Sequence, residues 1–302
     1  TDNHMAKILI TGGSGMIGQV LSKRLLKEDH QIVHLSRSPS KKDRFSTFKW
    51  DPKRRYIDES AFKGVDIIIH LAGTSIAQRW SAKNKKAIID SRVDTANLLS
   101  EYVKKIGLKL KVFISASGIG YYGGDTGEAL LTEHSPLGDD FIASVVDQWE
   151  EAADNFKEVC PVVKLRIGIV LSNHGGALPQ IALPVRYGVG AAIGSGKQYM
   201  SWIHIDDLAE VFALAATGKM KGVYNAVSDE PETNKHFTKT IAEVLNKPFF
   251  LPNIPKFFMR LYFGEMSILV TGGNRVSNAK LLKTGFEFKY NQLRPAIKDL
   301  LS

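Results

Sequence analysis

The chain has 302 residues, of which 44% are hydrophobic, and its mean hydropathy of -0.11 is that of an ordinary globular protein. No apolar run approaches the ~18 residues that a membrane span needs, so we expect no membrane partner. The single cysteine, Cys160, excludes a disulfide within the chain. A reducing, cytoplasmic location and a buried structural thiol at Cys160 are therefore predicted.

The net charge of +9 comes largely from basic segments in the first third of the chain, such as "SPSKKDRF" and "SAKNKK". Nucleic-acid binding is one interpretation of this charge. A solvated basic face together with a phosphate-bearing ligand is the other, and we favour it because no nucleic-acid-binding motif accompanies the charge. We therefore predict a small-molecule substrate and no nucleic-acid partner. The sequence carries no prediction of oligomeric state.

Short apolar runs alternate with helical patterns through the first half of the chain, after four residues, 1–4, that we expect to be a tag remnant. The predicted strands are 6–11, 31–36, 66–73, 111–117 and 161–170, and the predicted helices are 16–27, 81–105 and 140–157. Continuous apolar strands that alternate with helices are typical of a parallel sheet covered on both faces. We predict an α/β fold with a doubly wound parallel sheet of Rossmann type over residues 5–170.

After about Val170 the composition changes, and glycine and proline become frequent. The predicted elements there are strands at 200–203 and 222–226 and helices at 206–217, 234–245 and 291–300. We predict that residues 171–302 form a smaller C-terminal α/β substrate lobe, partly interleaved with the first lobe.

The segment "KILITGGSGMIGQVL" places a glycine cluster between the first strand and the first amphipathic helix. Glycine permits a tight turn and lets a diphosphate approach the backbone, while the helix amino end offers free N–H groups. The predicted cofactor contacts in this turn are Gly12, Gly13, Ser14, Gly15, Met16, Ile17 and Gly18. A second segment, "ILVTGGNRVS", lacks the later glycines and is predicted to be a turn in the smaller lobe.

The end of the second predicted strand bears on which dinucleotide binds. An acid commonly stands there in NAD-selective proteins, but this chain has Ser36 and Arg37. A guanidinium suits a 2′-phosphate, which a carboxylate would repel. We therefore predict NADP(H), with Ser36 and Arg37 as contacts.

Several motifs resemble the extended short-chain dehydrogenase/reductase superfamily, among them "TGGSGMIG", "HLAG", "ISASGIGYYG" and "WIHIDDLAEV". The segments "GGALP", "GSGKQYMSWIHIDD" and "GFEFKY" are similar to its atypical "epimerase family" branch, whose members are often labelled sugar-nucleotide epimerases or cell-division-inhibitor-like proteins. The resemblance covers nearly all of residues 5–302. It implies that Leu71, Ala72, Gly73 and Arg92 line the cofactor and that Arg166 flanks the nicotinamide.

The superfamily's chemistry relies on a Tyr-x-x-x-Lys pair and an upstream Ser or Thr. In this chain Phe141 and Val145 stand at the two positions of the pair, and no tyrosine has lysine four residues later. A phenyl ring cannot donate a proton. Ser117 matches the upstream serine, and Tyr121 or Tyr122 offers an alternative phenol, so these three are the candidate catalytic residues.

For Glu133, His204 and Asp206 we favour interpretations without a functional role. Glu133 is expected to be a surface loop acid rather than a substrate contact. His204 and Asp206 resemble a base and its orienting acid, but we expect Asp206 to cap the next helix. No residues have metal-ligand spacing, so no metal is predicted.

Two functions remain open. The chain is either an NADP-dependent oxidoreductase or epimerase acting on a small, nucleotide-linked or other substrate, or an NADP(H)-binding sensor that has lost its chemistry.

Overall fold

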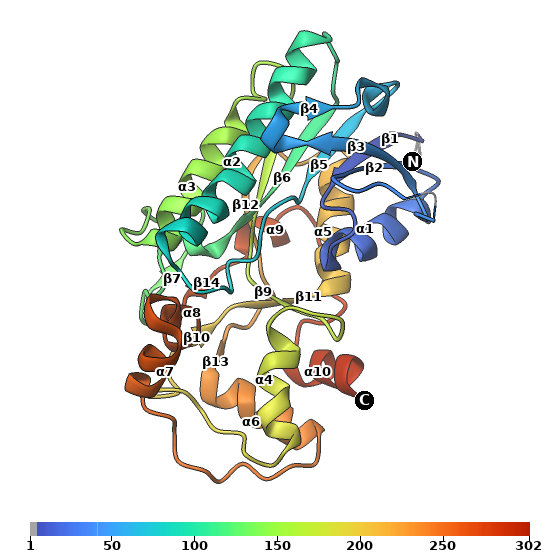
Figure 1. Cartoon of the computed structure of the whole chain (residues 1–302). Helices are drawn as coiled ribbons and strands as arrows, with labels where there is room; N and C mark the ends of the chain where they lie inside the picture. The colour runs from blue at the N-terminus through green and yellow to red at the C-terminus, as the bar shows by residue number, and fades with distance from the viewer. Residues whose placement is uncertain (1–4, 41) are drawn as a thin grey trace.

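The computed structural model describes residues 5–40 and 42–302. Helices cover both faces of a central sheet, and a smaller lobe lies beneath it in the view of Figure 1. Residues 1–4, which we expect to be a tag remnant, lie outside the described residues. None of the helices in the described ranges is long and apolar enough to cross a bilayer.

The central sheet has eight strands in the order β12-β8-β6-β5-β1-β2-β3-β4. All neighbours are parallel except β3 and β4. The strands are β1 (Lys7–Thr11), β2 (Gln31–Ser36), β3 (Ser46–Asp51), β4 (Tyr56–Ile57), β5 (Ile67–His70), β6 (Val112–Gly118), β8 (Val162–Ile167) and β12 (Gly222–Ala226).

The strand order reverses beside β1, since the chain runs outward through β2 and β3 and then returns to β5 on the other side of β1. Ligands of doubly wound sheets bind at the carboxyl ends of the strands at such a reversal. The predicted Rossmann-type doubly wound sheet is confirmed, and the topology places a ligand site next to the loop that follows β1.

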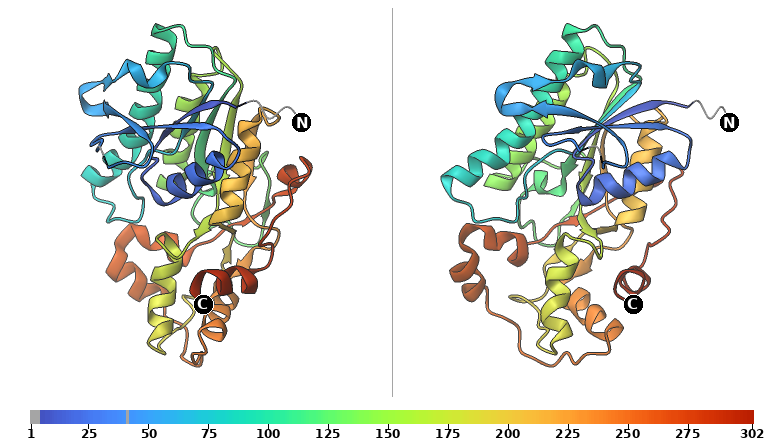
Figure 2. Two further views of the ribbon diagram at one scale, coloured as in Figure 1. Left: turned by 90° about the vertical axis from the view of Figure 1, so that its right-hand side faces the viewer. Right: turned by 45° about the vertical axis from the view of Figure 1, so that its right-hand side comes forward.

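Two pairs of helices cover the sheet, one pair on each face, as Figures 1 and 2 show. Helices α1 (Met16–Leu26) and α5 (Ile205–Ala216) pack together on one face, and α2 (Ala82–Lys105) and α3 (Phe141–Asp154) pack together on the other. Short 3₁₀ turns accompany the strands at η1 (Pro52–Arg54), η2 (Glu59–Phe62) and η3 (Ile119–Tyr122).

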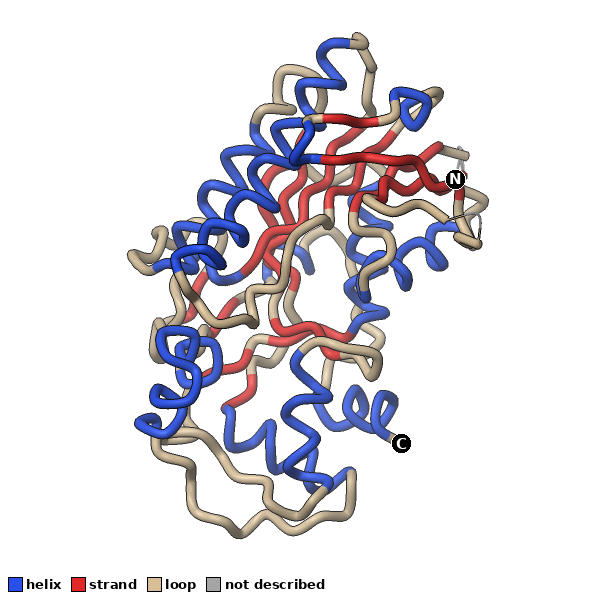
Figure 3. Tube along the Cα trace, in the orientation of Figure 1, coloured by secondary structure: helices blue, strands red, loops and turns tan. Residues whose placement is uncertain are grey.

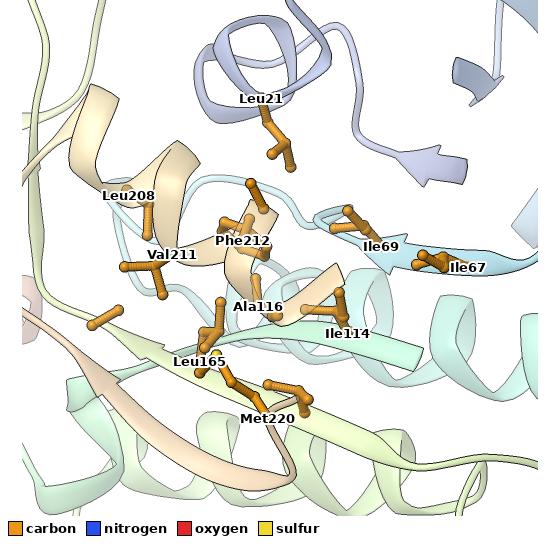
Figure 4. Packing of buried hydrophobic residues seen from close by; sticks show 14 of the residues in the cluster. Leu21, Ile67, Ile69, Ile114, Ala116, Leu165, Leu208, Val211, Phe212 and Met220 are labelled. Atoms are coloured by element: carbon orange, nitrogen blue, oxygen red, sulfur yellow. The ribbon is translucent and has the colours of Figure 1, made fainter. Parts of the chain in front are cut away.

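Successive side chains of a strand point to opposite faces of the sheet, so they pack alternately against the two helical layers. Ile8 and Ile10 of β1 lie in the hydrophobic cluster that contains Leu21 of α1 and Phe212 of α5, whereas Leu9 lies in the cluster on the α2 and α3 side. Figure 4 shows the first cluster, with the helix side chains lying over those of β5 and β6. Burial on both faces explains why these strands are apolar without interruption.

The smaller lobe gathers short elements around its own apolar core, which includes Trp202, Phe237 and Ile297. Figure 3 shows its helices grouped below the sheet. Its elements and those that join it to the sheet are β7 (Leu130–Leu131), β9 (Ile169–Leu171), α4 (Ala177–Arg186), β10 (Tyr199–Met200), β11 (Trp202–His204), β13 (Glu232–Thr233), α6 (Asn234–Val244), α7 (Lys256–Phe263), η4 (Gly264–Ser267), α8 (Ile268–Thr271), β14 (Arg275–Val276), α9 (Ala279–Leu282) and α10 (Leu293–Leu301).

The chain passes between the lobes more than once. The strand predicted over 161–170 is broken at Gly168, where a Cβ would lie 2.5 Å from the Ser201 carbonyl oxygen. Residues 169–171 then pair with β11 in the smaller lobe, while α5 and β12 return to the large sheet. The longer elements β3, α4 and α7 and several short ones were not predicted. Proline at 179 and 184 hides the helical pattern of α4, and consecutive aromatic residues hide that of α7.

The prediction of a buried thiol at Cys160 is confirmed, since the residue is buried and its burial raises the pKa to about 11.

Candidate active site

The loop after β1 is shaped by three close backbone approaches. Gly12 has φ of +71°, and a Cβ added to it would lie 3.0 Å from the Leu71 carbonyl oxygen. An added Cβ at Gly13 would lie 2.6 Å from the His34 ring, and one at Gly18 would lie 2.4 Å from the Gly12 carbonyl oxygen. These positions therefore require glycine, because any side chain would push the loop away from the sheet.

Helix α1 begins directly after this loop without a side-chain cap. Gly15 is the residue that precedes the helix, and no side chain accepts a hydrogen bond from the first turn. Ser14, Met16 and Ile17 complete the turn. Uncapped N–H groups and the positive end of the helix dipole form a site for a phosphate. The glycine cluster thus has the shape and the electrostatics of a diphosphate-binding turn.

The end of β2 carries the predicted 2′-phosphate contacts. Ser36 is half-buried, and its hydroxyl accepts a hydrogen bond of 3.2 Å from the Ser38 amide. Arg37 is exposed and forms no ion pair with any residue of the described ranges. No carboxylate occupies either position, which leaves the guanidinium free for an anion.

His34 of β2 is buried and supports the glycine loop. Its Nε2 lies 2.8 Å from the Ser22 hydroxyl, which donates to the Gly18 carbonyl at 2.6 Å. Burial lowers the pKa of His34, so its ring is a neutral support for the loop.

The end of β5 is tied to the end of β1 by Thr11. The Thr11 hydroxyl accepts hydrogen bonds of 3.2 Å from the amides of Leu71 and Ala72 and lies 2.8 Å from His70 Nδ1. His70 is fully buried between Thr11 and Thr95. Complete burial lowers the pKa of His70 to about 4. The backbone at Leu71 and Ala72 is therefore held beside the glycine loop.

The Arg92 side chain of α2 lies beside Gly73, which follows Leu71 and Ala72. A Cβ at Gly73 would lie 3.1 Å from the Arg92 guanidinium carbon, which lies 5.0 Å from the centre of the Trp149 ring. Arg92 donates to the Ile88 carbonyl at 2.9 Å, and burial lowers its pKa to about 10. Within the part of the chain that the structure describes, no carboxylate lies within ion-pair distance of Arg92. A largely buried cation without an anion fits a site that receives one.

Ser117, at the end of β6, is the first residue of a buried polar network. It is 4% exposed, and its hydroxyl donates to Glu150 at 2.6 Å. Glu150 also accepts hydrogen bonds of 2.8 and 3.0 Å from Arg166. Burial opposes the charge of Arg166, but the ion pair with Glu150 outweighs it and raises the pKa of Arg166. The structure therefore places Ser117 and Arg166 in the interior, engaged with the same carboxylate.

Tyr122 continues this network. Its hydroxyl donates to Asn225 at 2.7 Å and accepts from Arg166 at 3.1 Å, and burial raises its pKa. Tyr121 is half-buried, and the Arg166 guanidinium carbon lies 3.4 Å from the centre of its ring. Glu133, which we expected to be a surface loop acid, lies in a loop, is half-buried, and accepts a 2.8 Å hydrogen bond from the backbone amide of Asn225. Of the three candidate catalytic residues, only Tyr121 is partly exposed.

Phe141 and Val145 occupy the first two turns of α3. Val145 is buried in the interior, whereas the Phe141 ring packs edge-on against Trp80 with centroids 5.0 Å apart. Phe141 and Trp80 line a cavity of about 690 Å³ whose other wall is formed by α7 and α8. Phe141, which the resemblance places at the position of the superfamily's tyrosine, thus borders a cavity between the lobes.

His204 and Asp206 have structural roles. The expectation that Asp206 caps α5 is wrong, because His204 is the capping residue and its Nδ1 accepts from the Asp206 amide at 3.1 Å. His204 Nε2 lies 3.3 Å from Asp299, and its ring stacks on Tyr290. This contact ties α10 to the start of α5.

Sequence reasoning missed Glu150, which joins Ser117 to Arg166. The signal was present, because Glu150 follows Val146 by four residues and so shares the apolar face of α3. A carboxylate on a buried helix face needs a cation, and Arg166 on the neighbouring strand supplies it. Among the described residues, no group of three or more His, Cys, Asp or Glu could hold a metal ion.

Comparisons with known proteins complete the description of the site. Residues 8–226 match the NAD dependent epimerase/dehydratase family, and residues 254–300 match a domain of unknown function, DUF1731. Epimerase family protein SAR0825 of Staphylococcus aureus is 35% identical over 302 residues, covering 99% of this chain and 100% of that protein.

Two solved structures resemble the chain throughout its length. The human epimerase family protein SDR39U1 (isoform2), determined with NADPH, has a TM-score of 0.86 and 31% identity, covering 97% of this chain and 98% of that chain. The nucleoside-diphosphate sugar epimerase from Corynebacterium glutamicum has a TM-score of 0.81 and 30% identity, covering 99% of this chain and 59% of that chain.

Proposed function

The chain belongs to the NAD dependent epimerase/dehydratase family, and we propose that it binds NADP(H) and acts as an oxidoreductase or epimerase on a small substrate. Membership confirms the resemblance to the epimerase family branch of the extended short-chain dehydrogenases/reductases. The observation that carries the cofactor assignment is the uncapped glycine turn before α1, with two arginines nearby that lack carboxylate partners among the described residues.

The residues fit the parts of the cofactor. Gly12, Gly13, Ser14, Gly15, Met16, Ile17 and Gly18 form the turn that would hold the diphosphate. Ser36 and Arg37 would hold the 2′-phosphate, and Leu71, Ala72 and Gly73 would line the ribose side. Arg92 would neutralise a phosphate. The NADPH in the human relative's structure supports this assignment. Bound nicotinamide supplies hydride transfer.

The chain's own residues suggest how the substrate's oxygen is polarised. Ser117 and Tyr122 donate their hydroxyl protons to Glu150 and Asn225 and are buried. Tyr121 is partly exposed, with its ring held against Arg166. We therefore assign Tyr121 the contact with the substrate's oxygen and give Ser117, Tyr122 and Arg166 the role of positioning it.

A titration with NADPH followed by fluorescence, and a screen of carbonyl compounds followed at 340 nm, test this function. Tyr121→Phe should lower kcat at least about a hundredfold with the Kd for NADPH unchanged, because only the proton-donating group is lost. Ser117→Ala should lower stability while keeping measurable turnover. Full activity in Tyr121→Phe would overturn the assignment of Tyr121.

The cofactor preference has its own test. Arg37→Ala should weaken NADPH binding about tenfold to a hundredfold and leave NADH binding unchanged, because only NADPH carries the 2′-phosphate. Lys53→Ala, another exposed cation of the same lobe, is the control and should keep the preference. Equal affinity of the unaltered protein for NADPH and NADH would contradict the NADP(H) assignment.

A second function, an NADP(H)-binding sensor without turnover, is favoured by one observation. Phe141 and Val145 replace the superfamily's acid and its lysine, and the hydroxyls of Ser117 and Tyr122 are already engaged. Tight NADPH binding with no absorbance change across a broad carbonyl panel would support this function over catalysis.

A further inference from the structure

The cavity between the lobes has walls from both of them. Trp80 and Phe141 belong to the large lobe, while Phe257, Arg260 and Ile268 belong to the smaller one. Its volume is about 690 Å³, enough for a compact organic ligand. Three aromatic rings and an isoleucine therefore line one cavity at the amino end of α3.

Most polar groups of the lining already have partners. The Asp140 carboxylate accepts hydrogen bonds from the amides of Ala143 at 2.9 Å and Gly124 at 2.6 Å. The Trp80 indole N–H donates to the Ile76 carbonyl at 3.0 Å. Thr271 likewise donates within its own helical turn. A ligand with many hydroxyls, such as a sugar, would find few free partners on these walls.

The charged side chains that line the cavity differ in whether they have an ion-pair partner. Glu265 pairs with Lys85, whose ammonium lies 4.9 Å from the centre of the Phe141 ring. Lys256 lies 3.8 Å from Asp125. Arg260 is exposed, and its guanidinium makes no hydrogen bond or ion pair with any described residue. The cavity therefore offers one unpaired guanidinium, which binds a carboxylate through two parallel hydrogen bonds.

We propose that this cavity binds a small acid with a planar apolar body, whose ring packs against Trp80, Phe141 and Phe257 and whose anionic group meets Arg260. That this acid is also the substrate rests on the proposed function. The binding itself does not depend on it. The replacement of tyrosine by Phe141 contributes directly, since it makes the large-lobe wall apolar.

A matched pair of probes tests the ligand class. Biphenyl-4-carboxylate and biphenyl-4-carboxamide share a ring system and differ in charge, and both are titrated calorimetrically into the full chain, with and without saturating NADPH. The carboxylate should bind at least about tenfold more tightly than the amide. Arg260→Met should bring this ratio to about one, and Arg186→Met, an exposed arginine of α4 outside the cavity, should preserve it.

The ring contact is tested on exposed residues of α7, so that folding is kept. Phe257→Ala should weaken both probes alike, whereas Phe258→Ala, which is 55% exposed and does not line the cavity, should weaken neither. Equal binding of acid and amide to the unaltered protein, a ratio that survives Arg260→Met, or equal effects of Phe257→Ala and Phe258→Ala would each overturn the inference.

The NADPH titration separates the two proposals. If NADPH binds and the preference for the acid is absent, the ligand class is wrong and the proposed function stands. If the probes behave as expected and NADPH does not bind, the proposed function is wrong and the ligand class stands.

Discussion

The tripeptide Thr-Gly-Gly occurs twice, at 11–13 and at 271–273, and the two copies have different roles. The first ends the central strand β1 and leads into α1, whose first turn has no side-chain cap. The second ends the short helix α8 and passes between two other segments, where a Cβ at Gly272 would lie 2.2 Å from the Gly124 carbonyl oxygen. Both copies of the tripeptide pack closely against other segments, but only the first leads into the uncapped amino end of a longer helix, because the following residues differ.

The two threonines differ in the same way. The Thr11 hydroxyl serves the amides of Leu71 and Ala72 and contacts His70, so it joins two strands. The Thr271 hydroxyl donates only to the Ser267 carbonyl of its own helix, at 3.0 Å. The comparison teaches that the proposed cofactor site depends on contacts between strands, and three changes test this.

The largest effect is expected at Gly18, the glycine that the second cluster lacks. In Gly18→Ala the new methyl group would meet the Gly12 carbonyl oxygen at 2.4 Å and displace the turn. We expect NADPH binding to fall more than about a thousandfold, or about 4 kcal/mol. Calorimetric titration measures this loss.

Two controls accompany Gly18→Ala. Lys23→Ala, an exposed change on the same helix, should leave the Kd unchanged. Gly272→Ala should lower the free energy of unfolding by about 2 kcal/mol through overpacking, with the Kd for NADPH kept within about threefold. Loss of NADPH binding in Gly272→Ala at retained fold would remove the distinction between the two clusters.

The second effect is on the pH dependence of stability, and it tests how His70 supports the glycine loop through Thr11. Because burial lowers the pKa of His70 to about 4, the folded state holds the ring neutral. Its contribution to stability is complete above the unfolded pKa of about 6.5 and is lost as the pH falls from there to about 4. We expect this loss to reach about 3 kcal/mol.

Denaturant unfolding at pH 7 and pH 4.5 measures the contribution. In His70→Gln the difference between the two pH values should shrink by most of that amount, whereas His174→Gln, an exposed control, should leave it unchanged. An unchanged pH dependence in His70→Gln would show that His70 does not carry the acid sensitivity.

The smallest effect compares the two threonines directly. Thr11→Val removes an acceptor for two amides and should cost about 2 kcal/mol in the free energy of unfolding. Thr271→Val removes one bond within a helix and should cost less than about 0.5 kcal/mol. Chemical denaturation of both variants is the measurement, and equal costs would refute the view that only Thr11 joins two strands.

Much of the fold could be predicted because it depends on local periodicity. The apolar strands 31–36 and 222–226 and the start of α1 at Met16 are where the sequence places them, since burial on both faces and the glycine turn leave direct signals. The break at Gly168 was not predicted, because it depends on Ser201, 33 residues later, whose carbonyl oxygen leaves no space for a side chain.

For the candidate site, the sequence by itself determined the glycine cluster, the absence of an acid at Ser36 and Arg37, and the presence of Phe141 and Val145, whose side chains cannot transfer a proton. These are statements about which chemical groups exist at given positions. Only the tertiary structure decided which groups are engaged, since it brings Glu150 between Ser117 and Arg166 and leaves Arg92 without a described carboxylate partner. Pairing depends on distances across strands and helices, and no local pattern encodes those distances.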